Sequence, residues 1–205
     1  MEKLEEVKRS FYILKDPSRE YSKQAGVIAT LNEALVVKRK LSVRYKGPGW
    51  TAPKNYMLAP YAILLFKHAL YVAAQDDEHP DQIRFFSVKR IVAASITRKV
   101  FKVPRDFKLD EYMKDAFGIM VEKPRTVRIW FDGRIAPIIE ETVWHPSQKI
   151  KRDEDGSLVL SLRVGGLEEV LWWVLSYGAN AKILEPPELV EQMKKTLHEM
   201  QGRYL

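Results

Sequence analysis

The sequence predicts an α+β protein in which a small antiparallel sheet precedes a second, mixed domain. Changes in the spacing of apolar residues carry this prediction. These residues recur at helical spacing over residues 22–39, alternate with period two over residues 41–97, and follow a mixed strand and helix order from residue 125 onward. We therefore expect four parts: an N-terminal linker and helix (1–40), a β domain (41–100), a linker (101–124) and an αβ domain (125–205).

Residues 22–39, SKQAGVIATLNEALVVKR, are predicted to form an amphipathic helix. Val27, Leu31 and Leu35 recur on one face, and polar residues fall between them. The preceding Asp-Pro-Ser at residues 16–18 is a turn signal. Residues 2–10 are rich in charge, so we expect a short helix there, followed by an apolar docking segment at residues 11–14.

The β domain is predicted from alternation between short breaks. Its five expected strands are residues 41–45, 56–66, 69–74, 82–86 and 92–97. Gly47-Pro48-Gly49 separates the first two strands, Pro60 marks an irregularity in the second, and the acidic residues 75–81 form a turn. Because closing a sheet removes its exposed edges, five such strands favour a small barrel of the Sm or SH3 kind.

The αβ domain follows a linker that contains Pro104, Pro124 and a short helical stretch at residues 110–116. Its expected elements, in order, are a strand (126–131), a helix (133–141), a hairpin (148–151 with 157–164), a helix (168–177), a strand (181–184) and a last helix (186–203). Gly178 is a typical signal for a helix end. The order strand–helix–strand–strand–helix–strand indicates a ferredoxin-like αβ sandwich.

The net charge of +7 is spread unevenly along the chain. Residues 41–102 carry 10 Lys/Arg against 4 Asp/Glu, residues 1–40 carry 9 against 6, and residues 103–205 carry 15 against 17. A concentrated positive field favours a polyanion or phosphate ligand for the middle of the chain. A solvated basic surface without a ligand is the alternative.

Several classes of function find no support in the sequence. There is no cysteine, so disulfides, thiolate metal sites and a cysteine nucleophile are excluded, which fits a reducing cytoplasm. The four histidines lack metal-site spacing, and no nucleophile or phosphate-loop motif is present. The acidic run at residues 153–155 is better explained as a hairpin turn than as a metal loop. We expect no catalytic site, metal, cofactor or membrane span.

The candidate ligand residues centre on HALYVAAQDDEHPDQIRFFSVKRI, residues 68–91. There Arg84 and Arg90 flank an aromatic pair, and strand geometry places Arg84 and Phe86 on one face, with Phe85 on the other. Guanidinium groups bind phosphate through a planar fork of donors, while aromatic rings offer bases a stacking surface. The alternative is that Phe85 is core and that Arg84 pairs with an acid of the turn, Asp76, Asp77 or Asp81.

Longer motifs resemble two known families. The helix leading into LSVRY, followed by LAPYAILLFKHALYV and IRFFSVKRI, resembles the WYL domain over about residues 25–98. The name-giving Trp-Tyr-Leu falls on Leu70-Tyr71-Val72, where only the tyrosine is retained. The matching spacing is that of Pro60, Tyr71, Arg84, Phe86, Arg90 and Ile91. HPSQKIKRDEDGSLVLSLRV and LEEVLWWVLSYGANAKILEPPELVEQM resemble the WCX extension over about residues 124–200.

The resemblance implies the ligand-sensing and dimerising portion of a bacterial transcriptional regulator. Such a portion would bind single-stranded DNA, single-stranded RNA or a nucleotide. We assign the ligand contacts to Tyr61, Tyr71, Arg84, Phe86 and Arg90 of the barrel, and to Arg134 of the second domain. Regulators of this family usually begin with a winged helix-turn-helix. About twenty residues precede the linker helix here, so we expect a separate or truncated DNA-binding domain. The alternative is a homodimerising interaction module without a nucleic-acid ligand, with Trp172 and Trp173 in core or dimer contacts.

Overall fold

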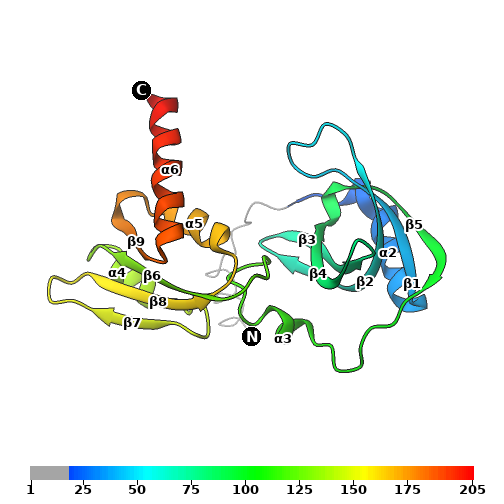
Figure 1. Ribbon diagram of the computed structural model, residues 1–205, viewed down its shortest axis with the longest axis horizontal. Helices are drawn as coiled ribbons and strands as arrows, with labels where there is room; N and C mark the ends of the chain where they lie inside the picture. The colour runs from blue at the N-terminus through cyan, green and yellow to red at the C-terminus, as the bar shows by residue number, and fades with distance from the viewer. Residues whose placement is uncertain (1–18) are drawn as a thin grey trace, which may run out of the picture. The chain divides into compact units, whose positions relative to one another are not determined.

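The computed structural model describes residues 19–205, and the chain divides into two compact units whose boundary in the sequence falls between Pro104 and Arg105 (Figure 1). The helix, docking segment and turn expected within residues 2–18 lie outside the described residues. Both units combine helices with an antiparallel sheet, so the α+β class is confirmed. None of the described helices is both long enough and apolar enough to cross a membrane.

The first unit begins with a short 3₁₀ turn, η1 (Ser22–Gln24), and helix α2 (Ala25–Val37). The helix buries Leu31 and Ala34 against the sheet, as the 3.6-residue periodicity predicts. It ends at Val37 because Lys38 adopts a left-handed conformation with φ 53°. The predicted helix is therefore confirmed and stops two residues earlier than expected.

Five antiparallel strands form the first sheet in the order β4-β3-β2-β1-β5. Their bounds are β1 (Arg39–Tyr45), β2 (Lys54–Phe66), β3 (Ala69–Asp76), β4 (His79–Ser87) and β5 (Ile91–Val100), with a 3₁₀ turn, η2 (Val88–Arg90), before β5. The irregularity expected at Pro60 is present as a register shift between β2 and β3. Among the described residues no ladder joins β4 to β5, so closure into an Sm- or SH3-like barrel is not confirmed.

The turn between β3 and β4 is shorter than the expected residues 75–81. Asp76 pairs with His79, so only Asp77 and Glu78 lie between the strands, and β4 then shifts register before Ile83. The expected bounds were wrong because the Asp76 carboxylate is buried. It accepts a hydrogen bond from the Glu78 amide at 2.8 Å, which stabilises a tight turn at the end of β3.

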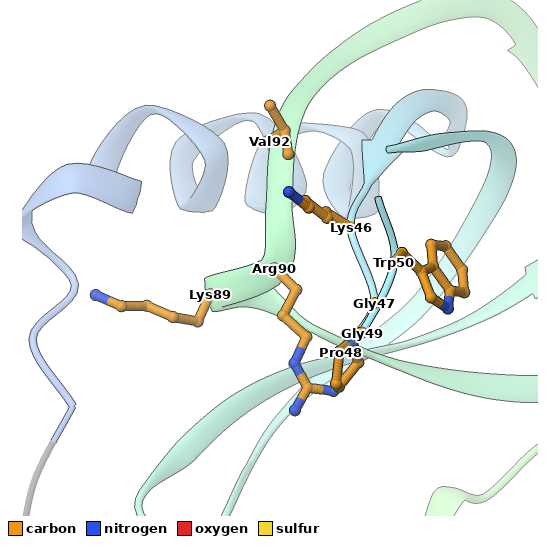
Figure 2. A pocket seen from close by; sticks show the side chains of 8 residues that line it. All are labelled: Lys46, Gly47, Pro48, Gly49, Trp50, Lys89, Arg90 and Val92. Carbon is orange, nitrogen blue, oxygen red and sulfur yellow. The ribbon is translucent and has the colours of Figure 1, made fainter. Parts of the chain in front are cut away.

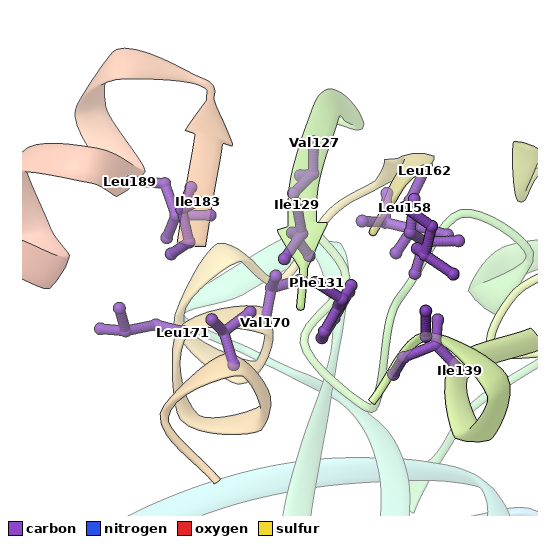
Figure 3. Close-up of a cluster of buried hydrophobic side chains, with 14 residues drawn as sticks. Val127, Ile129, Phe131, Ile139, Leu158, Leu162, Val170, Leu171, Ile183 and Leu189 are labelled. Atoms are coloured by element: carbon purple, nitrogen blue, oxygen red, sulfur yellow. The ribbon is translucent and has the colours of Figure 1, made fainter. Parts of the chain in front are cut away.

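The second unit contains a four-stranded antiparallel sheet in the order β7-β8-β6-β9. Its elements are α3 (Leu109–Met113), β6 (Arg125–Phe131), α4 (Ala136–Glu140), β7 (Lys149–Arg152), β8 (Leu158–Val164), α5 (Leu167–Leu175), η3 (Gly178–Asn180), β9 (Ala181–Glu185) and α6 (Pro187–Tyr204). Figure 3 shows side chains of β6, β8, β9 and helices α4, α5 and α6 converging on one core. Trp173 packs against this core, whereas Trp172 is exposed.

The chain from residue 115 to residue 122, here called the lead-in segment, is held against the β8–α5 junction. Glu169, in the first turn of α5, is buried and accepts hydrogen bonds from the amides of Ile119 (3.1 Å) and Met120 (2.9 Å). Gly165 donates to the carbonyl of Asp115 at 2.7 Å. Because these bonds all involve the backbone, they fix the path of the segment itself.

Candidate anion-binding site

The acidic residues of the first sheet are gathered at one place. Residues 39–75 and 82–105 contain no Asp or Glu, so the four acids of this stretch lie between positions 76 and 81. Asp76 pairs in register with Leu58 of β2, which in turn pairs with Leu41 near the start of β1. The far end of β1, where Tyr45 pairs with Lys54, therefore lies away from these four acids.

A rigid turn connects β1 to β2 at that far end. The Trp50 amide donates to the carbonyl of Gly47 at 3.3 Å, Pro48 occupies the second turn position, and Gly49 the third with φ 73°. These are the requirements of a type II turn, in which proline sets the first central φ and glycine accepts a positive one. The sequence Gly-Pro-Gly-Trp thus fixes where Lys46 and Trp50 stand.

This turn and η2 enclose an open cavity of about 610 Å³, here called the Arg90 pocket. Its lining residues are Lys46, Gly47, Pro48, Gly49, Trp50, Lys89, Arg90 and Val92 (Figure 2). The Lys46 amide donates to the carbonyl of Arg90 at 3.0 Å, which joins the two walls. Within residues 19–205, no acid lines the pocket, and neither Lys46 nor Arg90 forms an ion pair.

An aromatic cluster lies beneath the turn. The Tyr45 ring makes edge contacts with Trp50 (centroids 6.1 Å apart), Tyr56 (6.2 Å) and Phe86 (5.3 Å). The Lys54 ammonium lies 4.6 Å from the centre of the Trp50 ring. Edge contacts of this kind orient each ring against the next, so the cluster supports Trp50 from below and holds the turn on the sheet.

The structure places Arg84 at the other side of this cluster. Its Nη1 lies 2.6 Å from Oδ2 of Asp76, and its guanidinium stacks over the rings of Tyr56 (5.7 Å) and Phe86 (5.4 Å). Arg84 and Phe86 therefore share one strand face, as predicted. Phe86, rather than Phe85, is the core residue, with 3% of its surface exposed. The pairing of Arg84 with Asp76 matches the alternative interpretation of the sequence, in which Arg84 pairs with an acid of the turn.

The electrostatics of Asp76 explain how this carboxylate stays charged. Burial works to raise the pKa of Asp76, but hydrogen bonds from the Glu78 amide, His79 and Arg84 outweigh burial, and the pKa lies below the ordinary value of 3.8. Asp76, Glu78 and His79 also place one potential metal ligand each within 4.8 Å of one another. Since Arg84 and the Glu78 amide already occupy the Asp76 oxygens, we interpret this group as an ion-pair network.

The remaining predicted residues do not belong to the lining of the Arg90 pocket. Tyr61 of β2 stacks on Phe101, with ring centres 6.2 Å apart and planes at 10°, and its burial raises the pKa of its hydroxyl despite an opposing effect of Lys40. Tyr71 is half-buried on β3. Arg134 belongs to the second unit and bonds to Asp132 (2.9 Å) and Asn180 (2.8 Å). Of the six predicted contacts only Arg90 lines the pocket, and a ligand role for the six stays a prediction.

Sequence reasoning identified Arg90 but missed Lys46, Trp50 and the turn between them. Gly47-Pro48-Gly49 was interpreted only as a break between strands. A signal for the site was present in the sequence: a lysine and a tryptophan flank a type II turn motif. Such a turn has a fixed backbone conformation, so it holds the side chains on either side of it in defined positions.

We expect replacement of Gly47 by alanine to displace Trp50. An added Cβ would lie 2.6 Å from the indole ring, closer than such contacts occur, so the turn and ring would have to separate. The expected result is a change in Trp50 fluorescence and a loss of about 1–3 kcal/mol in the free energy of unfolding. Gly26→Ala is the matched control, since nothing lies within 4 Å of a Cβ added there. An unchanged Trp50 signal in the Gly47 variant would contradict the described packing.

Comparison with known proteins identifies both units. The profile of the WYL domain matches residues 26–96, and that of the WCX domain matches residues 123–201. A solved structure titled "CRISPR Cas-related protein" has a TM-score of 0.63 and 14% identity, covering 93% of this chain and 55% of that one. Proteasome accessory factor B/C (PafBC) of Arthrobacter aurescens has a TM-score of 0.40 and 16% identity, covering 88% of this chain and 27% of that one.

The chain therefore spans about half and about a quarter of the length of these two structures. No protein with a curated function matches the sequence. At 14% identity the first likeness shows a shared fold alone.

Proposed function

Because the chain belongs to the WYL-domain family, with a WCX domain after the WYL domain, we propose that it is the ligand-sensing and dimerising portion of a transcriptional regulator. The ligand would be single-stranded nucleic acid or a nucleotide, bound through its phosphates. An attached or separate DNA-binding domain would then respond to occupancy of the site.

The Arg90 pocket is the observation that carries this proposal. Three cationic side chains and two glycine backbones line it, while no acid of the described part of the chain does. A cation with an acidic partner must give up that partner before it binds a phosphate, whereas Arg90 and Lys46 have none to give up within the described residues. Phosphate gains charge-assisted hydrogen bonds from the Arg90 fork and from a lysine ammonium.

Arg84 would contribute indirectly to such a site. Its guanidinium is engaged by buried Asp76, and it packs on the same aromatic cluster that supports the turn of Trp50. We therefore propose Arg90 and Lys46 as the primary phosphate contacts, and Arg84 with Phe86 as residues that position them. Tyr61 and Tyr71 remain proposed contacts for a ligand that extends beyond the pocket within the first unit, and Arg134 remains a separate proposed ligand contact of the second unit.

The test is a fluorescence-anisotropy titration with an oligothymidylate of about 12 nucleotides, a length that one small nucleic-acid-binding domain can cover. We expect Arg90→Ala to weaken binding about 10-fold and to reduce the slope of log affinity against log salt by about 0.7, the value for one lost phosphate contact on a single strand. Arg98→Ala removes an exposed arginine of β5 outside the pocket lining and is the matched control. Equal affinity and slope for Arg90→Ala and the unsubstituted chain would refute the assignment.

A homodimerising module without a nucleic-acid ligand is the second candidate, and α6 supplies an observation in its favour. Val190 and Met193 pack on the core of the second unit, while Leu197, Met200 and Tyr204 continue their spacing of three and four residues but are exposed. Such a seam fits a second helix. Light scattering, which measures the oligomeric state, separates the two candidates when it is combined with the titration. A dimer that binds none of the oligonucleotides would favour the homodimerising module.

We further propose finer fold assignments. The first sheet, with its five sequential antiparallel strands and the irregularity at Pro60, would be a variant of the Sm- or SH3-like barrel. The second unit has the element order β6-α4-β7-β8-α5-β9, which is that of a ferredoxin-like sandwich. We also propose that the chain is divided into its functional parts at residues 40, 100 and 124.

A further inference from the structure

Lys89 connects two parts of the first unit, the Arg90 pocket and the segment that precedes α2. Its side chain lines the Arg90 pocket, yet its ammonium donates to the carbonyl of Glu20 and to Oε1 of Gln24, the latter at 3.2 Å. Figure 2 shows this side chain pointing away from Lys46 and Arg90, toward the chain that precedes α2. The ammonium also lies 5.6 Å from the centre of the Tyr21 ring. A pocket cation is thus engaged by the segment of residues 20–24.

That segment has few other attachments. The 3₁₀ turn η1 within it has no side-chain cap and buries no residue. Besides the bonds of Lys89, the segment is fixed by Tyr21, whose hydroxyl accepts a hydrogen bond from the Leu70 amide at 2.7 Å and whose ring packs against the core of the first unit. A segment held by so few contacts opens at low free-energy cost, so the loss of one of them has a large effect on its opening.

We propose that an anion in the Arg90 pocket draws the Lys89 ammonium away from residues 20–24 and so loosens the chain that leads into α2. This inference rests on the proposed function, because it assigns the route by which occupancy of that pocket is transmitted. The present partners of Lys89 are neutral oxygens, whereas a phosphate carries full charge and forms the stronger hydrogen bonds. The flexible stem of lysine allows the ammonium to exchange one set of partners for the other.

Neither of the other pocket cations can act in this way. Within residues 19–205, no hydrogen bond or ion pair joins the side chain of Lys46 or Arg90 to residues 20–24. Because coupling is reciprocal, any change that frees Lys89 from the segment must also raise the affinity of the pocket for its anion. The proposal therefore makes one prediction about local opening and another about affinity.

The test is amide hydrogen exchange of residues 20–24 in the full chain, measured with and without a saturating oligothymidylate of about 12 nucleotides. We expect the probe to speed exchange about 5-fold, the effect of losing one ordinary hydrogen bond. In Lys89→Ala this faster exchange should be present without the probe and unchanged by its addition. Arg98→Ala, which removes an exposed cation outside the pocket lining, is the matched control: without the probe its exchange should equal that of the unsubstituted chain, and saturation should speed it to the same extent.

The reciprocal effect is measured by anisotropy with Gln24→Ala, which removes one partner of Lys89 outside the pocket. We expect this variant to bind the probe about 2–5-fold more tightly. Probe binding with unchanged exchange at residues 20–24 would overturn the coupling and leave the proposed function standing, as would unchanged affinity in Gln24→Ala. Absence of any probe binding would overturn both.

Discussion

Replacing Arg84 by alanine is expected to lower the free energy of unfolding of the first unit by about 3 kcal/mol, without any ligand present. Asp76 is 1% exposed, and the Arg84 guanidinium 2.6 Å away is its cationic partner. Removing Arg84 leaves the buried carboxylate with the Glu78 amide and His79 but without the guanidinium that compensates its charge. Removing a surface ion pair, by contrast, changes stability by less than about 1 kcal/mol.

Urea denaturation followed by circular dichroism measures this loss, and a double-mutant cycle identifies its cause. The variant that combines Arg84→Ala with Asp76→Ala should be less destabilised than the two single effects would sum to, because it contains no unpaired charge. Arg98→Ala should change stability by less than about 0.5 kcal/mol. If Arg84→Ala weakened oligonucleotide binding at full stability, Arg84 would be a ligand contact and the structural interpretation would be wrong.

The same pair predicts a pH dependence. Since the pKa of Asp76 is lowered in the folded chain, its ion pair contributes stability above the ordinary value of 3.8 and loses that contribution as pH falls through the folded value. Unfolding free energies measured between neutral pH and pH values below 3.8 should therefore fall more steeply for the unsubstituted chain than for the double variant.

Glu169→Ala is expected to destabilise the second unit by about 3 kcal/mol. The Glu169 side chain is 6% exposed and accepts the amides of Ile119 and Met120. Its removal takes the acceptor from two partly buried backbone donors, and an unsatisfied donor costs about 1–3 kcal/mol when it is fully buried, so two partly buried ones together account for the expected loss. The loss should appear in thermal unfolding and as faster amide exchange in the lead-in segment.

Two variants sharpen this test. Glu168→Ala removes the neighbouring carboxylate of the same helical turn, which is exposed, and should leave both measurements nearly unchanged. Gly118→Ala should reproduce the Glu169→Ala result, because its Cβ would lie 2.2 Å from Oε1 of Glu169 and would expel the carboxylate. Equal stability of Glu168→Ala and Glu169→Ala would contradict the role assigned to the buried carboxylate.

Much of the secondary structure could be predicted because it depends on local spacing. Leu31 of α2 and Val43 of β1 are buried as helical and strand periodicity require, and the order of elements in both units matches the expectation. The boundaries of turns were harder to predict from the sequence. The tight turn at Asp77 and Glu78 depends on the buried carboxylate of Asp76, and burial of a single acid leaves no trace in periodicity.

The candidate site was less predictable than the fold. From the sequence, three acids of the turn were equally possible ion-pair partners for Arg84. Only the structure, in which Asp76 is buried at the end of β3, shows which of them forms the pair. Lys46 and Arg90 are far apart in the chain, yet the pairing of β1 with β5 brings them into one pocket. Long-range strand pairing is not encoded by any short window of residues, so a site formed by it escapes motif reasoning.

The amino-acid sequence by itself determined the α+β class, the order of the elements, the family resemblance and the position of the basic stretch. These follow from local periodicity and from charge counts that need no coordinates. Only the tertiary structure decided which cations face solvent without an acid, which are neutralised by a buried carboxylate, and which one is shared between the Arg90 pocket and the start of α2. The reason is physical: the free energy of a charge depends on its burial and on neighbours within a few ångströms, and folding draws those neighbours from distant parts of the chain.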